Sequence, residues 1–461
     1  MNIILFFNKF KGMKTILWLM VFALISNTAF ANEVKTVVLI NNVNIFNGKD
    51  NKIVKGNVLI EGNLIKKISN TPIMTNKSGS TKIIDGKGQY LIPGLIDNHA
   101  HLMFESIPQQ QAILSDYAFI NLFAAHAAEK QLLRGFTTVR DMGGGALSLA
   151  KAIDHGLVNG PRVFASGAFI SQTGGHGDFG FPTDVPRKIG ELSYQERNGM
   201  AVIADGADQV LIRSREQLRQ GATQLKLMAG GGVSSNYDPL DVSQYTEAEF
   251  KAAVDAASNW GTYVTVHAYT PHAIRTAINA GVKSIEHGQL IDDKTAKLMA
   301  EKGVWWSLQP FLDDEEAIPF PEGSANRKKQ LEMTKGTDNA YNLAKKYNVK
   351  LAWGTDCLFD PSLAVKQGKQ LAKMTRWFSP YQVLKMATYD NAQLLYLSGK
   401  RNPYQDGKLG EISEGAYADL ILVNGNPLEN IRLVEDPENN FKIIMKDGKI
   451  YKNTLCTRQI S

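Results

Sequence analysis

One feature constrains the fold of this chain more than any other. Between residues 93 and 407, short apolar runs alternate with amphipathic stretches such as 247–259 and 271–280, which have the spacing of helices. The eight runs read LIPGLIDNHAH, FTTVRDMGG, RVFASGAFIS, TQLKLMAGGG, YVTVHAY, SIEHGQ, VWWSLQP and LAWGTDC. Strands that alternate with helices form parallel sheets, so eight such units predict an α/β fold of the (β/α)8 TIM-barrel type.

A His, a Lys, an Asp or a His pair lies toward the C-terminal end of six of these runs, or in the loop that follows. Enzymes with a (β/α)8 barrel build their active sites at that end of the strands. A doubly wound sheet is the rival architecture, and it should show a glycine fingerprint at the start of an early helix. The glycine triplets at 143–145 and 230–232 lack the spacing of a dinucleotide or phosphate loop, so we favour the barrel.

The two ends of the chain differ from its middle. Residues 35–69 alternate apolar and polar side chains between turn signals, and residues 418–426 and 441–452 repeat this pattern. Such segments are typical of short antiparallel strands, and we expect one small β-sandwich built from both ends. The expected domains are the N-terminal part of the sandwich at 32–92, the barrel at 93–407 and the C-terminal part of the sandwich at 408–461.

The first 31 residues have the features of a signal peptide. Residues 16–25 form an apolar run that lysines precede, and Ala29 and Ala31 follow as the small residues that a signal peptidase requires. The run is shorter than the roughly 20 apolar residues needed to span a bilayer. We expect an exported protein, periplasmic or secreted, with no membrane contact after cleavage. Met13 is a candidate for the natural start.

Composition narrows the partners. The chain has 44% hydrophobic and 21% charged residues, as in a soluble globular protein. Part of the net charge of +6 comes from lysines in the first 31 residues, and the sequence has no arginine-rich helix or RNA-binding motif. We therefore expect a small-molecule substrate and no nucleic acid as the partner. Cys357 and Cys456 could form one disulfide, but we expect free thiols because Cys357 adjoins a candidate metal ligand. Homo-oligomerisation is left open.

The first candidate ligands are two histidines and a lysine. His99 and His101 are two residues apart on an expected strand, so their imidazoles face the same side and can chelate a zinc-like metal. Lys226 stands between Leu225 and Leu227 in a run that the barrel would bury, where an unpaired ammonium is unfavourable. Burial lowers the pKa of a lysine and exposes a neutral amine. Carbon dioxide can add to that amine to give a carbamate, an anionic ligand able to bridge two metals.

Three more candidates lie on later runs. His267 and His287 place imidazoles on the fifth and sixth runs, and Asp356 adds a carboxylate at the end of the eighth. Taken singly, each of these residues is more often an ordinary hydrogen-bonding group at a strand end. All are nevertheless consistent with the barrel mouth that His99 and Lys226 would share, so the sequence predicts a metal centre there.

These motifs, in this order, resemble the amidohydrolase superfamily in its binuclear form with a carboxylated lysine. The resemblance rests on LIPGLIDNHAH, LKLMAGG, VTVHAY, SIEHG and WGTD, and on GKLGEISEGAYADLILVNGNPL, which is similar to the segment that returns the chain to the β-sandwich. Within the superfamily, SQTGGHGD at 171–178 and HAYT resemble the imidazolonepropionase-like group. That group includes Xaa-Pro and other dipeptidases and enzymes that cleave N-acyl amino acids.

The resemblance implies two divalent metal ions, with zinc as the expected metal. One metal would be held by His99, His101 and Asp356, the other by His267 and His287, and the carbamate on Lys226 and a hydroxide would bridge them. The hydroxide would attack the amide carbonyl, and Asp356 would carry its proton to the leaving amine.

The same resemblance assigns two residues to the substrate. His176 and Tyr269 match positions that the related dipeptidases use around the substrate carbonyl and carboxylate. We therefore expect a hydrolase that cleaves the amide bond of a dipeptide, Xaa-Pro or similar, or of an N-acyl amino acid. The alternatives are a cyclic amide or imide hydrolase of the same superfamily and a non-catalytic binding protein on the same scaffold. Mononuclear imidazolonepropionase-type enzymes and deaminases fit less well, because they do not use a lysine such as Lys226.

Overall fold

The computed structural model describes residues 36–75, 81–188 and 190–455. The predicted signal peptide and Cys456 lie outside these ranges, so export and the free thiol of Cys456 stay predictions. From Val37 onward the chain forms one structural unit. No helix within the described ranges has the length and apolar character needed to cross a membrane.

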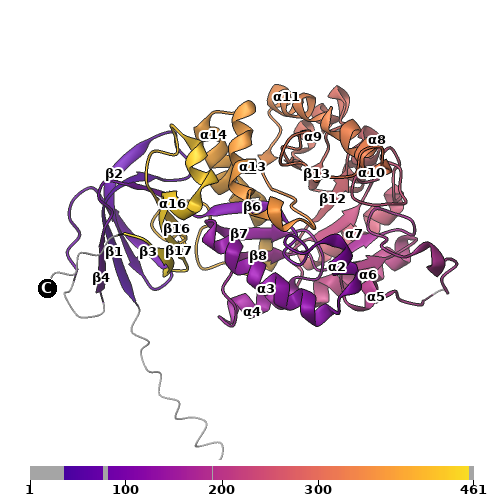
Figure 1. Cartoon of the computed structure of the whole chain (residues 1–461), viewed down its shortest axis with the longest axis horizontal. Helices are drawn as coiled ribbons and strands as arrows, with labels where there is room; N and C mark the ends of the chain where they lie inside the picture. Colours follow the sequence, from indigo (N-terminus) through magenta and orange to yellow (C-terminus); the bar gives the residue numbers. More distant parts are fainter. Residues whose placement is uncertain (1–35, 76–80, 189, 456–461) are drawn as a thin grey trace, which may run out of the picture. The chain divides into compact units, whose positions relative to one another are not determined.

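Two parallel sheets make up the middle of the chain (Figure 1). The smaller sheet contains β6 (Leu95–Ala100), β7 (Phe136–Asp141) and β8 (Arg162–Ala165) in that order. The larger sheet has the order β10 (Ala201–Ile203), β9 (Phe169–Ser171), β11 (Leu225–Met228), β12 (Val264–Ala268), β13 (Ser284–His287), β14 (Trp305–Ser307) and β15 (Leu351–Ala352). The α/β class with parallel strands is therefore confirmed.

The third expected run departs from the prediction. RVFASGAFIS forms two strands instead of one, because the chain turns at Gly167, whose φ of 75° lies in the left-handed region. Its first half, β8, pairs with β7, whereas its second half, β9, pairs with β10 and β11. The strand β10 was not expected, since its three residues are too few to show a period.

Helices follow most of the strands along the chain. They are α2 (Gln109–Leu114), α3 (Tyr117–Leu133), α4 (Leu147–Asp154), α5 (Tyr194–Arg197), α6 (Ala207–Arg219), α7 (Glu247–Trp260), α8 (Pro271–Ala280), α9 (Asp293–Lys302), α10 (Ala325–Thr334), α11 (Thr337–Tyr347), α12 (Pro361–Ala364), α13 (Gln367–Lys373), α14 (Pro380–Lys385), α15 (Asn391–Leu395) and α16 (Pro437–Asn440). The expected helices at 247–259 and 271–280 are confirmed as α7 and α8. Thr246 and Glu249 start α7 with a reciprocal capping box, and Gly261 ends it in the left-handed conformation.

Backbone hydrogen bonds join the two parallel sheets at both of their edges. On one side, the N–H of Asn98 in β6 donates to the carbonyl of Trp353, just beyond β15, over 3.1 Å. On the other, the N–H of Thr223, just before β11, donates to the carbonyl of Ala165 in β8 over 2.9 Å. The ends of β6 and β15 are thereby adjacent, although they are far apart in the sequence.

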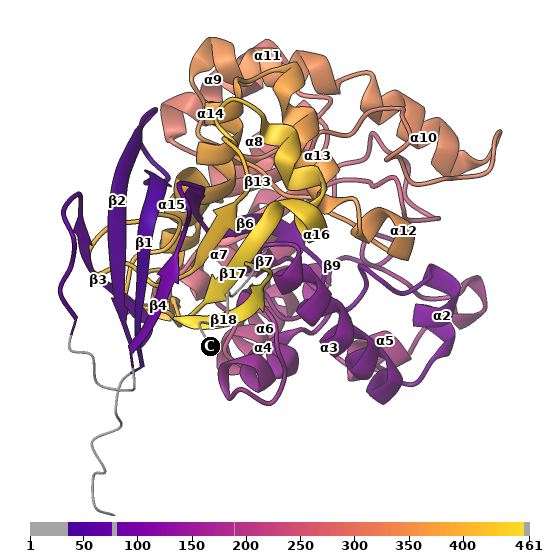
Figure 2. The ribbon, with the colours of Figure 1, turned by 60° about the vertical axis from the view of Figure 1, so that its left-hand side comes forward.

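Strands from both ends of the chain share one mixed sheet (Figures 1 and 2). Its order is β18 (Lys449–Asn453), β17 (Phe441–Lys446), β16 (Leu420–Val423), β5 (Tyr90–Pro93), β1 (Val37–Phe46), β2 (Ile53–Glu61) and β3 (Leu64–Ser69), and β4 (Thr81–Asp85) pairs with β1. Both ends of the chain thus contribute strands to one sheet, and the β-sandwich expected from the sequence stays a prediction. β5 joins the two halves, since it pairs with β1 and with β16.

A buried charged group fastens this mixed sheet to the smaller parallel sheet. Arg162, the first residue of β8, donates to Asp419 over 2.9 Å and to Asp447 over 2.6 Å. Its guanidinium also lies 3.8 Å from the centre of the Tyr417 ring. Lys446 of β17 donates to the carbonyl of Gly160, just before β8, over 2.8 Å. These contacts fasten the C-terminal strands β16 and β17 to the start of β8.

Candidate active site

The eight residues singled out in the sequence line one cleft. The empty space in it, including the part open to solvent, is about 1120 Å³. The ligand candidates come from the ends of β6, β11, β12 and β13 and from the loop after β15. The cleft residues are His99, His101, His176, Lys226, His267, Tyr269, His287 and Asp356. Placement on neighbouring parallel strands brings their side chains together, as the alternation along each strand predicts.

Neighbouring imidazoles are in ring contact throughout the cluster. The ring centres lie 5.3 Å apart for His99 and His101, and 4.9 Å apart for His99 and His287. His267 follows at 4.5 Å from His287, and His176 stacks on His267 at 4.1 Å. These contacts join residues of four different segments into a single group at the floor of the cleft.

Each of the four histidines proposed as ligands has one ring nitrogen held by an oxygen acceptor. The acceptors are Glu286 Oε2 for His99 Nδ1 at 2.8 Å, the Gly143 carbonyl for His101 Nδ1 at 3.1 Å, the Gly231 carbonyl for His267 Nε2 at 3.0 Å, and Gln309 Oε1 for His287 Nδ1 at 2.7 Å. A carbonyl or carboxylate oxygen can only accept, so the ring nitrogen donates and the other nitrogen of a neutral ring keeps its lone pair. Metal-binding histidines are held in this way.

The imidazoles whose pKa is shifted are kept neutral. Burial lowers the pKa of His99 to about 4, although the nearby carboxylates of Asp356 and Glu286 oppose this. Burial, together with the neighbouring imidazoles, also holds the pKa of His267 and of His287 well below the usual value. A neutral imidazole is the form that binds a metal ion.

Lys226 lies on β11 with 1% of its surface exposed. Among the residues that the structure describes, none forms a hydrogen bond or ion pair with its Nζ. Burial lowers the pKa of Lys226 to about 8, against the opposing effect of Glu286 and Asp356. A buried amine that titrates near neutral pH and has no partner is available for reaction with carbon dioxide. This unpartnered nitrogen fits the carbamate expected from the sequence.

Asp356 forms a compact group with the first two histidines. Its Oδ1 lies 3.4 Å from His99 Nε2 and 3.3 Å from His101 Nε2, and ligand atoms of the three residues all lie within 4.8 Å of one another. Burial alone would raise the pKa of Asp356, but the imidazoles of His99, His101 and His287 outweigh it and hold that pKa below its usual value. The carboxylate is therefore ionised at neutral pH and able to bind a cation.

The backbone around Asp356 is held in an unusual conformation. Asp356 has a φ of 50° and His287 a φ of 73°, both in the left-handed region that non-glycine residues rarely adopt. The loop is fixed by the N–H of Asp356, which donates to the His99 carbonyl over 2.8 Å. Asp97 also holds it, because its carboxylate accepts the hydroxyl of Thr355 over 2.6 Å. Strain of this kind persists where the surrounding structure over-determines it, commonly at functional sites.

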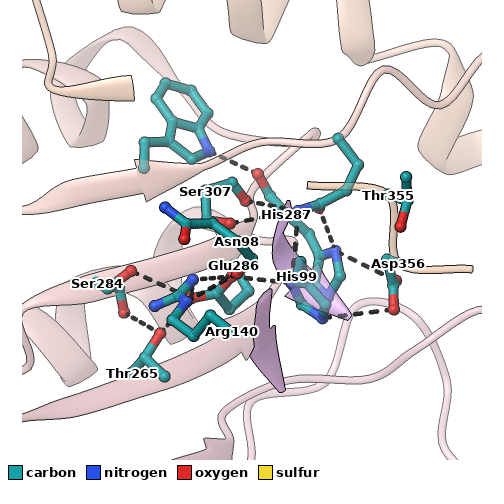
Figure 3. A network of polar contacts seen from close by, with 12 residues as sticks. Asn98, His99, Arg140, Thr265, Ser284, Glu286, His287, Ser307, Thr355 and Asp356 are labelled. Atoms are coloured by element: carbon teal, nitrogen blue, oxygen red, sulfur yellow. Dashed lines mark hydrogen bonds and ion pairs between the residues drawn. The ribbon is translucent and has the colours of Figure 1, made fainter. Parts of the chain in front are cut away.

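Beneath His99 lies a fully buried ion pair that the sequence analysis did not identify (Figure 3). Arg140 Nη2 donates to both carboxylate oxygens of Glu286, over 2.7 and 2.8 Å, and neither side chain is exposed. Glu286 also accepts from Thr265 and Ser284. Burial alone would raise the pKa of Glu286, but Arg140, His99 and Lys226 together outweigh it and hold that pKa well below the usual value. Glu286 therefore stays charged and orients His99.

His176 reaches the cluster from the loop after β9. Its Nδ1 lies 2.8 Å from Ser235 Oγ and 3.7 Å from Asp238 Oδ2. Asp238 fixes the opposite loop, because its Oδ2 accepts the N–H of Gly232 over 2.8 Å. A Cβ at position 232 would overlap the His176 ring, so glycine in the triplet at 230–232 allows this close approach.

The Tyr269 ring packs edge-on against the His267 ring, with ring centres 5.0 Å apart, and Tyr269 is 4% exposed. Burial raises the pKa of Tyr269 well above its usual value, so its hydroxyl stays protonated and can donate. Tyr269 also packs with Val233 and Met333 in an apolar wall of the cleft.

Sequence analysis missed the partners of the site more than the site itself. Glu286 and Arg140 carry a signal that could have been used, since each is a charged residue inside an apolar strand-like run and their charges are opposite. Gln309 carries a weaker signal of the same kind, as a polar residue at the end of the run VWWSLQP. Ser235 and Asp238 carry none, because they lie in a loop where polar residues are ordinary.

Comparison with known proteins identifies relatives that match most of the chain. The model of the Amidohydrolase family matches residues 90–452. The ochratoxinase of Aspergillus niger is 32% identical over 372 residues, which cover 78% of this chain and 75% of that protein.

Solved structures agree with this match. A crystal structure of a prolidase complexed with N-methylphosphonate-L-proline has a TM-score of 0.81 and 32% identity, covering 91% of this chain and 100% of that one. A Xaa-Pro dipeptidase with methionine bound in its active site has a TM-score of 0.77 and 30% identity, covering 90% and 100% respectively. The chain is therefore a hydrolase that acts on carbon–nitrogen bonds, and it belongs to the amidohydrolase family.

Proposed function

We propose that this enzyme hydrolyses an amide bond that stands next to a free carboxylate, in a dipeptide (Xaa-Pro or similar) or an N-acyl amino acid. The observation that carries the proposal is the group of four tethered imidazoles, one unpartnered lysine and one carboxylate in a single cleft. The similar prolidase supports the substrate class. Its ligand is an L-proline whose nitrogen bears a tetrahedral phosphonate in place of a planar acyl group, which is the geometry expected of an amide under attack.

We assign two divalent metal ions, with zinc as the proposed metal, to this cleft. His99, His101 and Asp356 would hold one ion and His267 and His287 the other, with a carbamate on Lys226 as a shared ligand. When bound, such ions supply Lewis-acid chemistry, because they make a water more acidic and polarise the scissile carbonyl. The free lone pairs of the four tethered histidines support this assignment.

The chain's own residues would hold the substrate and move the proton. Asp356 is ionised and lies at the centre of the group, so its free oxygen can accept a proton and pass it to the leaving nitrogen. The protonated Tyr269 hydroxyl can donate to a substrate oxygen. If the Ser235 hydroxyl donates to His176 Nδ1 at 2.8 Å instead of to the Gly232 carbonyl at 3.2 Å, His176 Nε2 carries a proton that it can donate to the substrate carboxylate or carbonyl.

We also propose a barrel architecture for the middle of the chain and export of the protein from the cytoplasm. The hydrogen bonds at both edges of the two parallel sheets support their closure into one (β/α)8 barrel, with the mixed sheet folded as a β-sandwich. Residues 1–31 support export to the periplasm or medium, where the partner would be a small-molecule substrate.

A comparison of each acid with its methyl ester tests the carboxylate. The parent should lose at least about tenfold in kcat/KM on the ester of L-Xaa-L-Pro or of an N-acyl amino acid, because a buried donor is then left without its partner. His176→Ala should reduce that penalty, since one donor is missing for both substrates. Equal rates on acid and ester in the parent would contradict the proposal and favour a cyclic amide hydrolase.

A further inference from the structure

A second cavity adjoins the active-site cleft. Its empty space, including the part open to solvent, is about 370 Å³, and no charged side chain is among the described residues that line it. Helices α2 and α5 contribute residues such as Ile113 and Gln195 to its wall. Phe104, Phe179 and Phe359 line both this cavity and the cleft. We call the cavity the annex and these three residues the aromatic partition.

The aromatic partition is built from the segments that carry the site. Each of its members follows a site residue by three positions. The pairs are His101 and Phe104, His176 and Phe179, and Asp356 and Phe359. The N–H of Phe104 donates to the His101 carbonyl over 2.8 Å, and the N–H of Phe359 donates to the Phe104 carbonyl over 2.8 Å. The partition therefore stands next to residues proposed as ligands of the first metal ion.

Close packing holds the rings of the partition in place. A Cβ at Gly144 would lie 2.5 Å from Phe104 Cε2, so this glycine lets the backbone approach the face of the ring. Phe104 also packs against Phe359, with ring centres 5.5 Å apart, and Phe169 packs edge-on against Phe179 at 5.6 Å. Phe359 has a φ of 58°, a left-handed conformation that a bulky residue keeps only where its surroundings fix it.

This packing limits the space that the cleft offers to an apolar group. Insertion of extra apolar volume into a closely packed wall forces side chains out of their preferred rotamers. Removal of one ring of the partition would instead join the annex to the cleft, and the enlarged apolar surface would favour a hydrocarbon group. The partition, and not the metal ligands, then sets the largest group that fits beside it.

We propose that Phe104, Phe179 and Phe359 are specificity-determining residues, which close off the annex and exclude substrates with a bulky apolar group beside His101 and Asp356. This inference rests on the proposed amide hydrolysis. It adds a size limit that applies equally to dipeptides and to N-acyl amino acids. The annex is a latent subsite, which a shorter side chain in the partition would open.

The test uses pairs of substrates that differ only by a phenyl ring. L-phenylalanyl-L-proline is compared with L-alanyl-L-proline, and L-alanyl-L-phenylalanine with L-alanyl-L-alanine, so that the ring stands on either side of the scissile bond. Both pairs are also made without the α-amino group. In metal-loaded Phe179→Ala, the ratio of kcat/KM for the bulky over the small substrate should exceed the parental ratio at least about tenfold in one pair or more, as expected of an enlarged apolar pocket.

Two further variants locate the cause. Phe181→Ala changes the same residue type in the same loop, at a site that is 49% exposed and lines neither cavity, so it should keep the parental ratio. Ile113→Phe in the Phe179→Ala background refills the annex from α2 and should return the ratio to the parental value. Phe179→Leu, a smaller truncation, gives the same comparison if the alanine variant does not fold.

The outcomes separate the inference from the proposed function. A folded Phe179 variant with the parental ratio in every pair would overturn the inference, and so would a gain that survives Ile113→Phe. Hydrolysis of none of these substrates by the parent would contradict the proposed function itself.

Discussion

The buried pair beneath His99 makes a sharp prediction about both stability and metal binding. Glu286→Gln retains the shape of the side chain but removes its charge. Arg140 would then be left fully buried with no carboxylate, although its contacts to the Asn98 carbonyl at 2.7 Å and the Tyr263 hydroxyl at 3.2 Å would remain. His99 Nδ1 would lose its charged acceptor at 2.8 Å.

The magnitude follows from these two losses. Removal of one partner of a buried ion pair costs about 3–5 kcal/mol, which is a large part of the roughly 5–15 kcal/mol that stabilises a folded protein. Loss of the carboxylate that orients a metal-binding histidine lowers metal affinity by about 10–100-fold. We expect both effects in Glu286→Gln, and neither in Glu332→Gln, an exposed site on α10.

The assay separates the two effects with a second variant. Urea unfolding measures stability, and zinc competition against a chromogenic chelator measures affinity. Arg140→Met in the Glu286→Gln background should recover stability because no unpaired charge remains, but it should not recover affinity. A Glu286→Gln protein within about 1 kcal/mol of the parent, with parental zinc affinity, would refute the idea that this pair orients His99.

Two further predictions concern the surroundings of the site. Asp238→Asn weakens the anchor of the loop with Gly232 and Ser235 that contacts His176, so kcat/KM should fall at least about tenfold while the metal content stays unchanged. The exposed Asp241→Asn is the control and should match the parent. Unchanged kinetics for Asp238→Asn would contradict a role of Asp238 in positioning His176. Burial, opposed by Arg134, raises the pKa of Glu105 from 4.5 to about 7. The folded state then keeps a proton that the unfolded state has released, so stability falls as the pH rises from 4.5 to 7. Glu105→Gln removes that loss of stability, so the Tm of the variant minus the Tm of the parent should be larger at pH 8 than at pH 5. The same Tm difference at both pH values would argue against a raised pKa of Glu105.

Much of the site could be predicted because its geometry depends on strand alternation. The ends of parallel strands meet at one edge, so His99, Lys226, His267 and His287 on different runs had to lie close together if the runs formed neighbouring strands. Asp356 was found for the same reason, because it lies in the loop that follows β15.

The rest depends on features that sequence periodicity does not encode. The turn at Gly167 that separates β8 from β9 is set by a single left-handed residue inside an apolar run. The contact of His176 with Ser235 joins two loops from different parts of the chain. The ion pair of Glu316 with Lys373 likewise joins a loop to α13, and the periodicity of neither segment indicates it.

The metal content of purified protein tests the central assignment most directly. Elemental analysis of the parent should give two divalent ions per chain. Lys226→Ala should give one or fewer, because the shared anionic ligand is missing. Lys446→Met should keep both, because Lys446 is buried outside the lining of the cleft and donates to the Gly160 carbonyl. A Lys226→Ala protein that retains two ions per chain and parental turnover would contradict the account.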